Sequence, residues 1–251
     1  MKLFKLIVPA LFTVAIAACG GKNNSESAFT VEGVLAGGEN KTLYIEEMTP
    51  DNGPQFIDSI KCDKKGHFSF STAMPYQTFY NLHATQYDFV VLLPSAGETI
   101  KINGRYDALG ESYTTSGSEG SQQMWTIQQH INESKEFIAS LAQAEKANKE
   151  NLNEQEYARA HAITDSLFIE EYQVIFNLLH TFITDNQGSL ATLYAIDAPF
   201  NIRNRVFDAN EHFSIFEEVL DGLVLSQPDN PHTQYFKMRV ERERSRRELG
   251  I

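Results

Sequence analysis

The sequence predicts an α+β protein, in which an N-terminal antiparallel β-sandwich or barrel of about seven strands precedes an all-helical region with a long helical hairpin. Two observations predict this class. From Ala28 to Thr115, apolar and polar residues alternate between turn signals, which is the pattern of half-buried strands. After Gly117, the apolar residues recur at helical spacing. We therefore place the sandwich at 28–117 and the helical region at 118–251.

The chain begins with the features of a lipoprotein signal peptide. Lys2 and Lys5 precede an apolar stretch, and Ile16-Ala17-Ala18-Cys19 places small residues before a cysteine, as a lipoprotein signal peptidase requires. The stretch is shorter than the ~20 apolar residues that span a bilayer. We expect residues 1–19 to be a signal with a lipobox, Cys19 to carry lipid and bind the membrane, and the polar residues 20–27 to form a flexible tether. The alternative is an ordinary secretory signal with an incidental cysteine.

The predicted strands follow one another between short turns. Gly37-Gly38 forms the first turn, and Gly66 suits a left-handed position in a later one. The continuous apolar run of Tyr87–Leu93 predicts a central strand. The strands contain, in order, Phe29–Leu35, Leu43–Ile45, Phe56–Cys62, His67–Phe70, Phe79–Leu82, Tyr87–Leu93 and Thr99–Ile102. Short strands at such regular spacing are typical of a small sandwich or barrel.

Capping residues mark the long helices. Residues 117–121 offer caps for a helix whose apolar face includes Met124, Ile127 and Ile131. Asn153 and Glu156 have the spacing of a capping box and open a second long helix. Because the connection near 149–151 is short, the two helices should pair as an antiparallel hairpin.

Three shorter helices are predicted after the hairpin. Residues 186–188 end its second helix, and 189–196 form a short helix that stops before Pro199. Asp208–Glu211 reads as a second capping box, and Asn230-Pro231 caps the last helix. That last helix is rich in arginine. Such a run is commonly a solvated helix face, and a docking site for an acidic partner is the alternative.

Charge and motifs exclude several function classes. The formal net charge of −12 argues against nucleic acid as a partner. The chain has no nucleophile elbow, phosphate-binding loop or dinucleotide fingerprint. Its seven histidines lack the spacing of zinc ligands. We therefore predict no catalytic residues, no metal and no cofactor.

Two residues are candidates for modification or redox chemistry. Cys62 is the only thiol besides Cys19, so it is either a redox thiol or a small strand residue, and the chain has no Cys-x-x-Cys for disulfide exchange. Asp58-Ser59-Ile60 resembles an O-glycosylation sequon of Gram-negative envelope proteins, and Asp165-Ser166-Leu167 matches it too. The alternative for Ser59 is a local hydrogen bond that fixes the adjacent turn.

A series of short motifs resembles a known family. The lipobox is followed by the segments 29–35, 43–45, 57–60, 66–70 and 91–102, including Gly97-Glu98-Thr99-Ile100-Lys101-Ile102. Their order is similar to that of a domain of unknown function found N-terminal to thioredoxin-like (AhpC/TSA-family) envelope lipoproteins of Bacteroidetes. In the longer members a thioredoxin domain with Cys-x-x-Cys follows the helices, and no such positions exist here. The resemblance implies location and fold, but it transfers no catalytic residue.

The leading functional hypothesis is a non-catalytic cell-envelope lipoprotein. It would be anchored in the outer membrane, face the periplasm, and bind an envelope protein, or a glycan, through its sandwich and helices. One alternative is an accessory or shortened relative of a thiol–disulfide oxidoreductase. Another is a small-ligand binder that uses an aromatic face of the sandwich.

Overall fold

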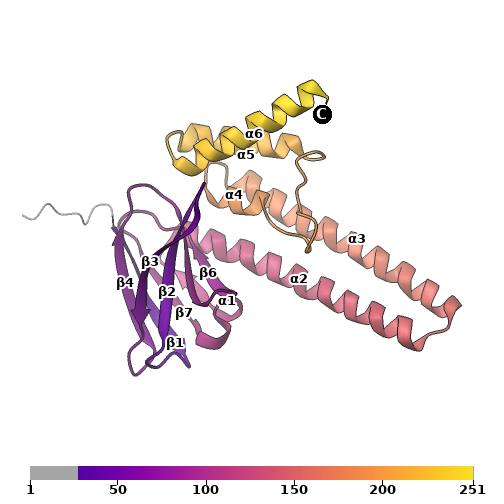
Figure 1. The fold of residues 1–251 in the computed structure, drawn as a ribbon, viewed down its shortest axis with the longest axis horizontal. Coiled ribbons are helices and arrows are strands. Elements are labelled where there is room, and N and C mark those ends of the chain that lie inside the picture. The colour runs from indigo at the N-terminus through magenta and orange to yellow at the C-terminus, as the bar shows by residue number, and fades with distance from the viewer. Residues whose placement is uncertain (1–27, 251) are drawn as a thin grey trace, which may run out of the picture.

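The computed structural model describes residues 28–250. The predicted lipidation site Cys19, the signal 1–19 and the tether 20–27 lie outside these described residues. Figure 1 shows a β-sandwich at one end, a helical hairpin that projects far from it, and a group of shorter helices above both. The predicted class, a sandwich followed by a helical region with a long hairpin, is confirmed.

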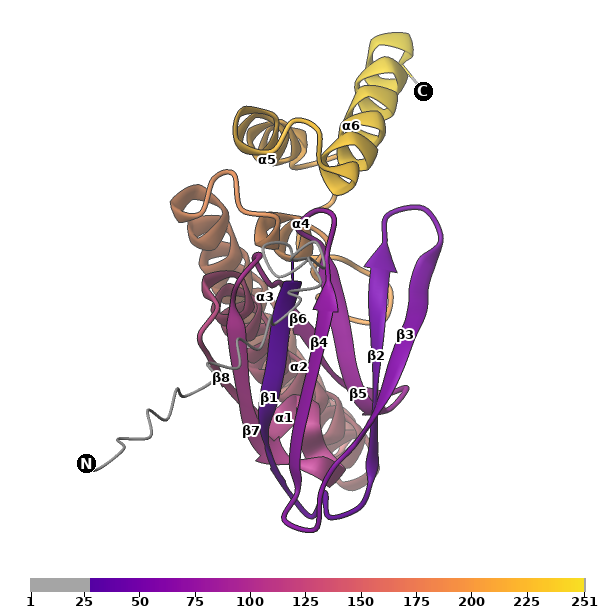
Figure 2. The same ribbon diagram turned by 90° about the vertical axis from the view of Figure 1, so that its left-hand side faces the viewer.

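The sandwich consists of two four-stranded sheets, with the strand orders β4-β1-β7-β8 and β3-β2-β5-β6 (Figure 2). The strands are β1 (Ala28–Ala36), β2 (Thr42–Thr49), β3 (Gly53–Lys61), β4 (His67–Ala73), β5 (Phe79–Thr85), β6 (Asp88–Leu92), β7 (Thr99–Arg105) and β8 (Thr114–Ser116). All pairs in the second sheet are antiparallel, but β1 and β7 pair in parallel, so the first sheet is mixed. The expectation of a purely antiparallel sandwich was wrong at this pair.

The alternating pattern buries one face of each strand in the sandwich. Val31 in β1, Ile45 in β2 and Ile100 in β7 are fully buried in one core, whereas their sequence neighbours Glu32, Tyr44 and Lys101 point outward. Gly33 allows the close approach of β1 and β7, because a Cβ there would lie 1.7 Å from the carbonyl oxygen of Ile102. Gly66, at φ 79°, has the left-handed backbone that the sequence predicted.

The sequence predicted that the apolar run of Tyr87–Leu93 forms a central strand. This was wrong, because the run forms the edge strand β6. Its pattern has a different cause. Val90 and Leu92 face the sandwich core, whereas Val91 and Leu93 pack into a second core with the helices. An edge strand therefore has both faces covered, and it carries the unbroken apolar sequence of a central one.

The hairpin consists of α2 (Glu119–Asn151) and α3 (Glu154–Asp185), which run antiparallel (Figure 1). Ser118 caps α2 by accepting a hydrogen bond from the backbone of Ser121. Asn153 and Glu156 form the predicted capping box at the start of α3. None of the helices within 28–250 combines the length and apolarity needed to cross a bilayer.

The remaining helices are α1 (Leu109–Ser112), α4 (Ala191–Ile196), α5 (Phe213–Ser226) and α6 (Pro231–Leu249). Asn230 and Pro231 cap α6 as predicted. The predicted capping box at Asp208–Glu211 was wrong, because its residues form a turn and α5 begins later, after His212. The Asp208 side chain accepts a hydrogen bond from the backbone of Asn210, whereas the backbone N–H of Glu211 donates to the Asp208 carbonyl.

A polar seam joins the sandwich to the last two helices. Its residues are Gln77 and Thr78, which precede β5, Gln227 and Asn230, in the turn between α5 and α6, and His232, in the first turn of α6. Asn230 donates to the Gln77 carbonyl at 2.8 Å, and Gln227 donates to the Gln77 side chain at 3.2 Å. His232 Nε2 lies 2.8 Å from Thr78 Oγ1. Together with the shared apolar core, these bonds fix the helices on the sandwich.

Candidate functional site

A cleft of about 690 Å³ lies in the helical region. It lies between α3, the connection from α4 to α5, and α6. Its size is in the range of small-molecule and peptide sites. We call it the arginine–aromatic cleft. The lining residues used below are Phe168, Ile169, Tyr172, Asp197, Phe200, Arg203, Arg205, Asp208, Glu211 and Arg239.

Aromatic side chains form the apolar wall of the cleft. The rings of Phe168 and Tyr172, on α3, lie 5.1 and 5.2 Å from that of Phe200. The Tyr172 hydroxyl donates to the carbonyl of Val206 at 3.0 Å, which fixes the ring. Ile169 remains 61% exposed beside them. Apolar surface is therefore exposed in the cleft of the folded protein.

A short loop carries the arginines. Phe200 and Val206 donate backbone hydrogen bonds to Asn204 and Ala198, so the segment 198–206 folds back on itself. The Asn201 side chain accepts from the backbone of Arg203 at 2.8 Å and of Asn204 at 2.9 Å. Such a side-chain turn fixes the loop tip before any ligand arrives.

Asp197 stands between two guanidinium groups. Arg239, from α6, binds it bidentately, with Nη1–Oδ2 at 2.6 Å and Nη2–Oδ1 at 2.8 Å. Arg205 donates to the same carboxylate through Nη1. The hydrogen bond to Asp197 raises the pKa of Arg239 above its ordinary value. Two cations share one anion here, so a positive charge remains at this end of the cleft.

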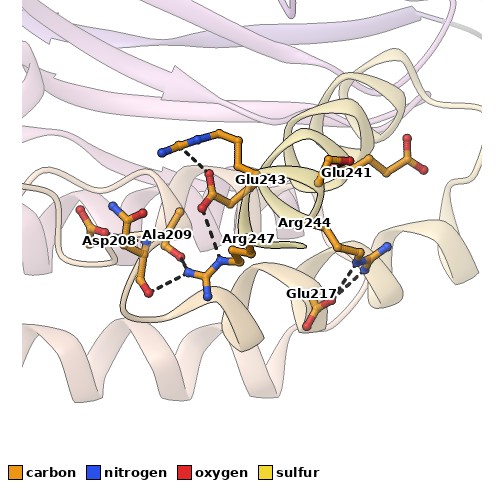
Figure 3. Close-up of polar contacts among 10 residues, drawn as sticks. Asp208, Ala209, Glu217, Glu241, Glu243, Arg244 and Arg247 are labelled. Carbon is orange, nitrogen blue, oxygen red and sulfur yellow. Dashed lines mark hydrogen bonds and ion pairs between the residues drawn. The ribbon is translucent and has the colours of Figure 1, made fainter. Parts of the chain in front are cut away.

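Two other arginines of α6, Arg244 and Arg247, contact the neighbouring segments. Figure 3 shows Arg244 against Glu217 of α5, with Nη2–Oε1 at 2.8 Å, and Arg247 next to Glu243. Arg247 also donates to the carbonyls of Ala209 and Asn210, the latter at 2.7 Å. These arginines remain exposed, so the basic run is a solvated helix face that also makes contacts within the protein.

The predicted candidates Ser59 and Cys62 lie in the sandwich, away from the cleft. Cys62 is a free thiol that is 2% exposed in the sandwich core. Burial raises the pKa of its thiol, whereas reactive cysteines have lowered values. The geometry therefore favours a structural role for Cys62.

Ser59 is exposed on the edge strand β3. Its backbone N–H donates to Asp58 Oδ1 at 2.7 Å, so the local hydrogen bond considered from the sequence is present. The side chain of Ser166 is on the exposed side of α3. Tyr44 and Phe56, 39% and 62% exposed, supply aromatic surface on the neighbouring part of the sandwich.

A group of acid–base residues links the two helices of the hairpin. Glu145 accepts from the Tyr157 hydroxyl at 2.6 Å and lies 2.8 Å from His161 Nδ1. The hydrogen bond from Tyr157 lowers the pKa of Glu145. Across 28–250, histidine, cysteine and carboxylate side chains nowhere gather in threes as a metal site would require. The arrangement is a clamp between helices.

Sequence reasoning missed the cleft. Its residues come from three segments that are far apart in the chain, and no spacing rule connects Phe168 to Arg239. One local signal was present. The segment 199–207 places Arg203 and Arg205 between two phenylalanines in a region of loop propensity, which is unusual for a solvated loop.

The structure is a β-sandwich followed by a helical region that contains the arginine–aromatic cleft. Residues 29–124 match the model of a family described as Domain of unknown function (DUF4369). The resemblance to a domain of unknown function is therefore confirmed for the sandwich and the first turns of α2. No curated protein matches the chain. The cleft lies entirely outside the matched segment.

Proposed function

We propose that this protein is a non-catalytic cell-envelope lipoprotein that binds a protein partner at the arginine–aromatic cleft. Cys19 would attach it to the outer membrane on the periplasmic side. The observation that carries the proposal is the cleft itself, in which exposed apolar surface adjoins guanidinium groups on a loop that is already ordered. Aromatic, aliphatic and arginine side chains of this kind anchor protein interfaces.

The shape of the helical region supports a protein as the partner. Ile202, at the tip of the arginine loop, is fully exposed, and Ile169 borders the cleft. Exposed isoleucines favour contact with apolar side chains over contact with a hydrated sugar. A glycan partner would more commonly be met by exposed aromatic rings, such as Tyr44 and Phe56 on the sandwich.

Site-specific photocrosslinking in cells tests this proposal. A photoreactive phenylalanine analogue replaces Ile202 or Ile169, and the matched control replaces Ile163, which is 62% exposed on the same helix as Ile169. We expect the same discrete protein adduct from both cleft positions and not from Ile163. Absence of an adduct at both cleft positions, or the same adduct at all three, would contradict the assignment.

The anchor needs a separate measurement. Metabolic labelling with an alkyne-bearing fatty acid should mark the wild-type protein, and the Cys19→Ala variant should carry no label. A wild-type protein that stays unlabelled would refute the lipoprotein assignment, whereas the binding function of the cleft would still be tested by crosslinking.

A further inference from the structure

We propose that the arginine–aromatic cleft binds the free C-terminal carboxylate of a partner polypeptide whose last residue is aromatic or large and aliphatic. This inference rests on the proposed function and names the chemistry of the partner. It comes from the position of unused N–H donors next to an apolar wall.

The arginines of the loop have donors to spare. The Asp197 carboxylate is already held by Arg239 through both oxygens, and Arg205 adds one more hydrogen bond through Nη1. Arg205 lines the cleft, and its side chain remains 56% exposed. Within 28–250, the guanidinium of Arg203 makes no ion pair. A carboxylate is the group that such paired, planar donors bind best.

Charge favours an anion at this end of the cleft. The cleft lining as a whole is balanced, with Arg203, Arg205 and Arg239 against Asp197, Asp208 and Glu211, so an anion is favoured only beside the arginines. The acidic residues Asp208 and Glu211 also line the cleft, at the segment that Arg247 holds through the carbonyls of Ala209 and Asn210. The ligand's carboxylate should therefore lie at Arg203 and Arg205, and not at the Asp208 end.

Arginines and apolar side chains line the same cleft, which favours a chain terminus as the ligand. Phe200 belongs to the same short loop as Arg203 and Arg205, and it contacts Phe168 and Tyr172 of the wall. A ligand that contacts both would present a carboxylate beside an apolar group. A C-terminal residue does this, because its α-carboxylate and its side chain leave the same carbon atom.

Peptide binding to the full chain, purified in detergent, tests the inference. The probes are acetyl-Ala-Ala-Phe with a free carboxylate, the same peptide as its amide, and acetyl-Ala-Glu-Phe-amide, measured by ligand-observed NMR. We expect the free acid to bind about tenfold more tightly than the amide, as the loss of a charged hydrogen-bond pair implies. The glutamate peptide should not recover this affinity.

Variants assign the effect to the loop. Arg205→Gln and Arg203→Gln should each weaken binding of the free acid severalfold and reduce its advantage over the amide. The matched control is Arg159→Gln, which changes an exposed arginine on α3 outside the cleft and should have no effect. The far-ultraviolet circular dichroism of each variant reports whether it is folded.

The inference is overturned if acid and amide bind equally, if neither binds, if the glutamate peptide binds as well as the free acid, or if Arg159→Gln weakens binding as much as Arg205→Gln. Binding of a sugar acid such as galacturonate in place of the peptides would also overturn it. A discrete crosslink at Ile202 together with absent peptide binding would refute this inference alone and leave the proposed function standing. Absence of the crosslink would refute the proposed function.

Discussion

Protonation of His232 should make the seam between sandwich and helices sensitive to acid. The imidazole is 8% exposed, its Nε2 lies 2.8 Å from Thr78 Oγ1, and its ring is edge-on to Phe79 with the centroids 5.1 Å apart. Burial lowers the pKa of His232 to about 4, from the value of about 6.5 that it has in an unfolded chain. The folded protein therefore holds this side chain neutral.

The sign of the pH effect follows from these two values. Because the folded-state pKa lies below the unfolded-state pKa, the unfolded chain takes up the proton first as the pH falls. The free energy of unfolding is unaffected by this group above about pH 7, and it declines between about pH 6.5 and pH 4. Linkage gives a loss of about 2 kcal/mol between pH 7 and pH 5 and about 3 kcal/mol by pH 4.

Urea unfolding at pH 7, 6 and 5 measures this loss. His232→Gln removes the titration, so the variant should be less stable than the wild type at pH 7, and the difference should shrink by about 2 kcal/mol at pH 5. The control His180→Gln changes a histidine outside the seam whose side chain is 42% exposed, and it shows what the loss of a histidine alone does to stability. Parallel profiles for the wild type and His232→Gln would refute the reasoning.

Three further predictions concern single residues. Gly33→Ala should lower the free energy of unfolding, measured in urea, by more than about 3 kcal/mol, because the new Cβ would clash with the Ile102 carbonyl. The control is Gly37→Ala, where nothing lies near the new Cβ. It should lower the free energy of unfolding by only about 1 kcal/mol, because an alanine is strained at the positive φ of Gly37. Asn153→Ala removes the capping box of α3 and should lower the free energy of unfolding by about 1 kcal/mol, and an unchanged midpoint would contradict this role. The buried thiol of Cys62 should not react with iodoacetamide in the native protein, and it should react once urea unfolds the chain. Peptide mapping by mass spectrometry measures this labelling. Rapid labelling of the native protein would contradict the structural role of Cys62 and support the redox hypothesis.

Local signals carried most of the correct sequence predictions. The caps at Asn153 and Asn230 and the left-handed turn at Gly66 depend on residues within one turn of each other, so their chemistry can be read directly. Asp208–Glu211 has the sequence pattern of a capping box, but these residues form a turn. The reason is that the Asp208 side chain takes the nearer N–H of Asn210, and the helix starts only at Phe213.

Local sequence rules could not predict which segments far apart in the chain pair with each other. The parallel pairing of β1 with β7 joins Thr30 to Thr99, and the alternating pattern of either strand would serve an antiparallel neighbour equally well. The run at β6 was misassigned because burial on both faces has two causes, a central position in a sheet or an edge position under a helix. The cleft depended on the same kind of information, since Asp197 and Arg239 meet only after α6 has folded back.

The seam and the cleft share one helix, and this connects acid stability to binding. α6 carries His232 in its first turn, which bonds to the sandwich, and Arg239, which bonds to Asp197 in the cleft. Loosening the start of α6 should therefore release the Asp197 pair and the loop that depends on it. Conversely, a ligand that binds at Arg205 binds only the folded arrangement, so it should raise the unfolding midpoint. If the two sites are coupled in this way, the stabilisation by a cleft ligand at pH 7 should diminish in His232→Gln, and equal stabilisation in both proteins would show that the seam and the cleft act independently.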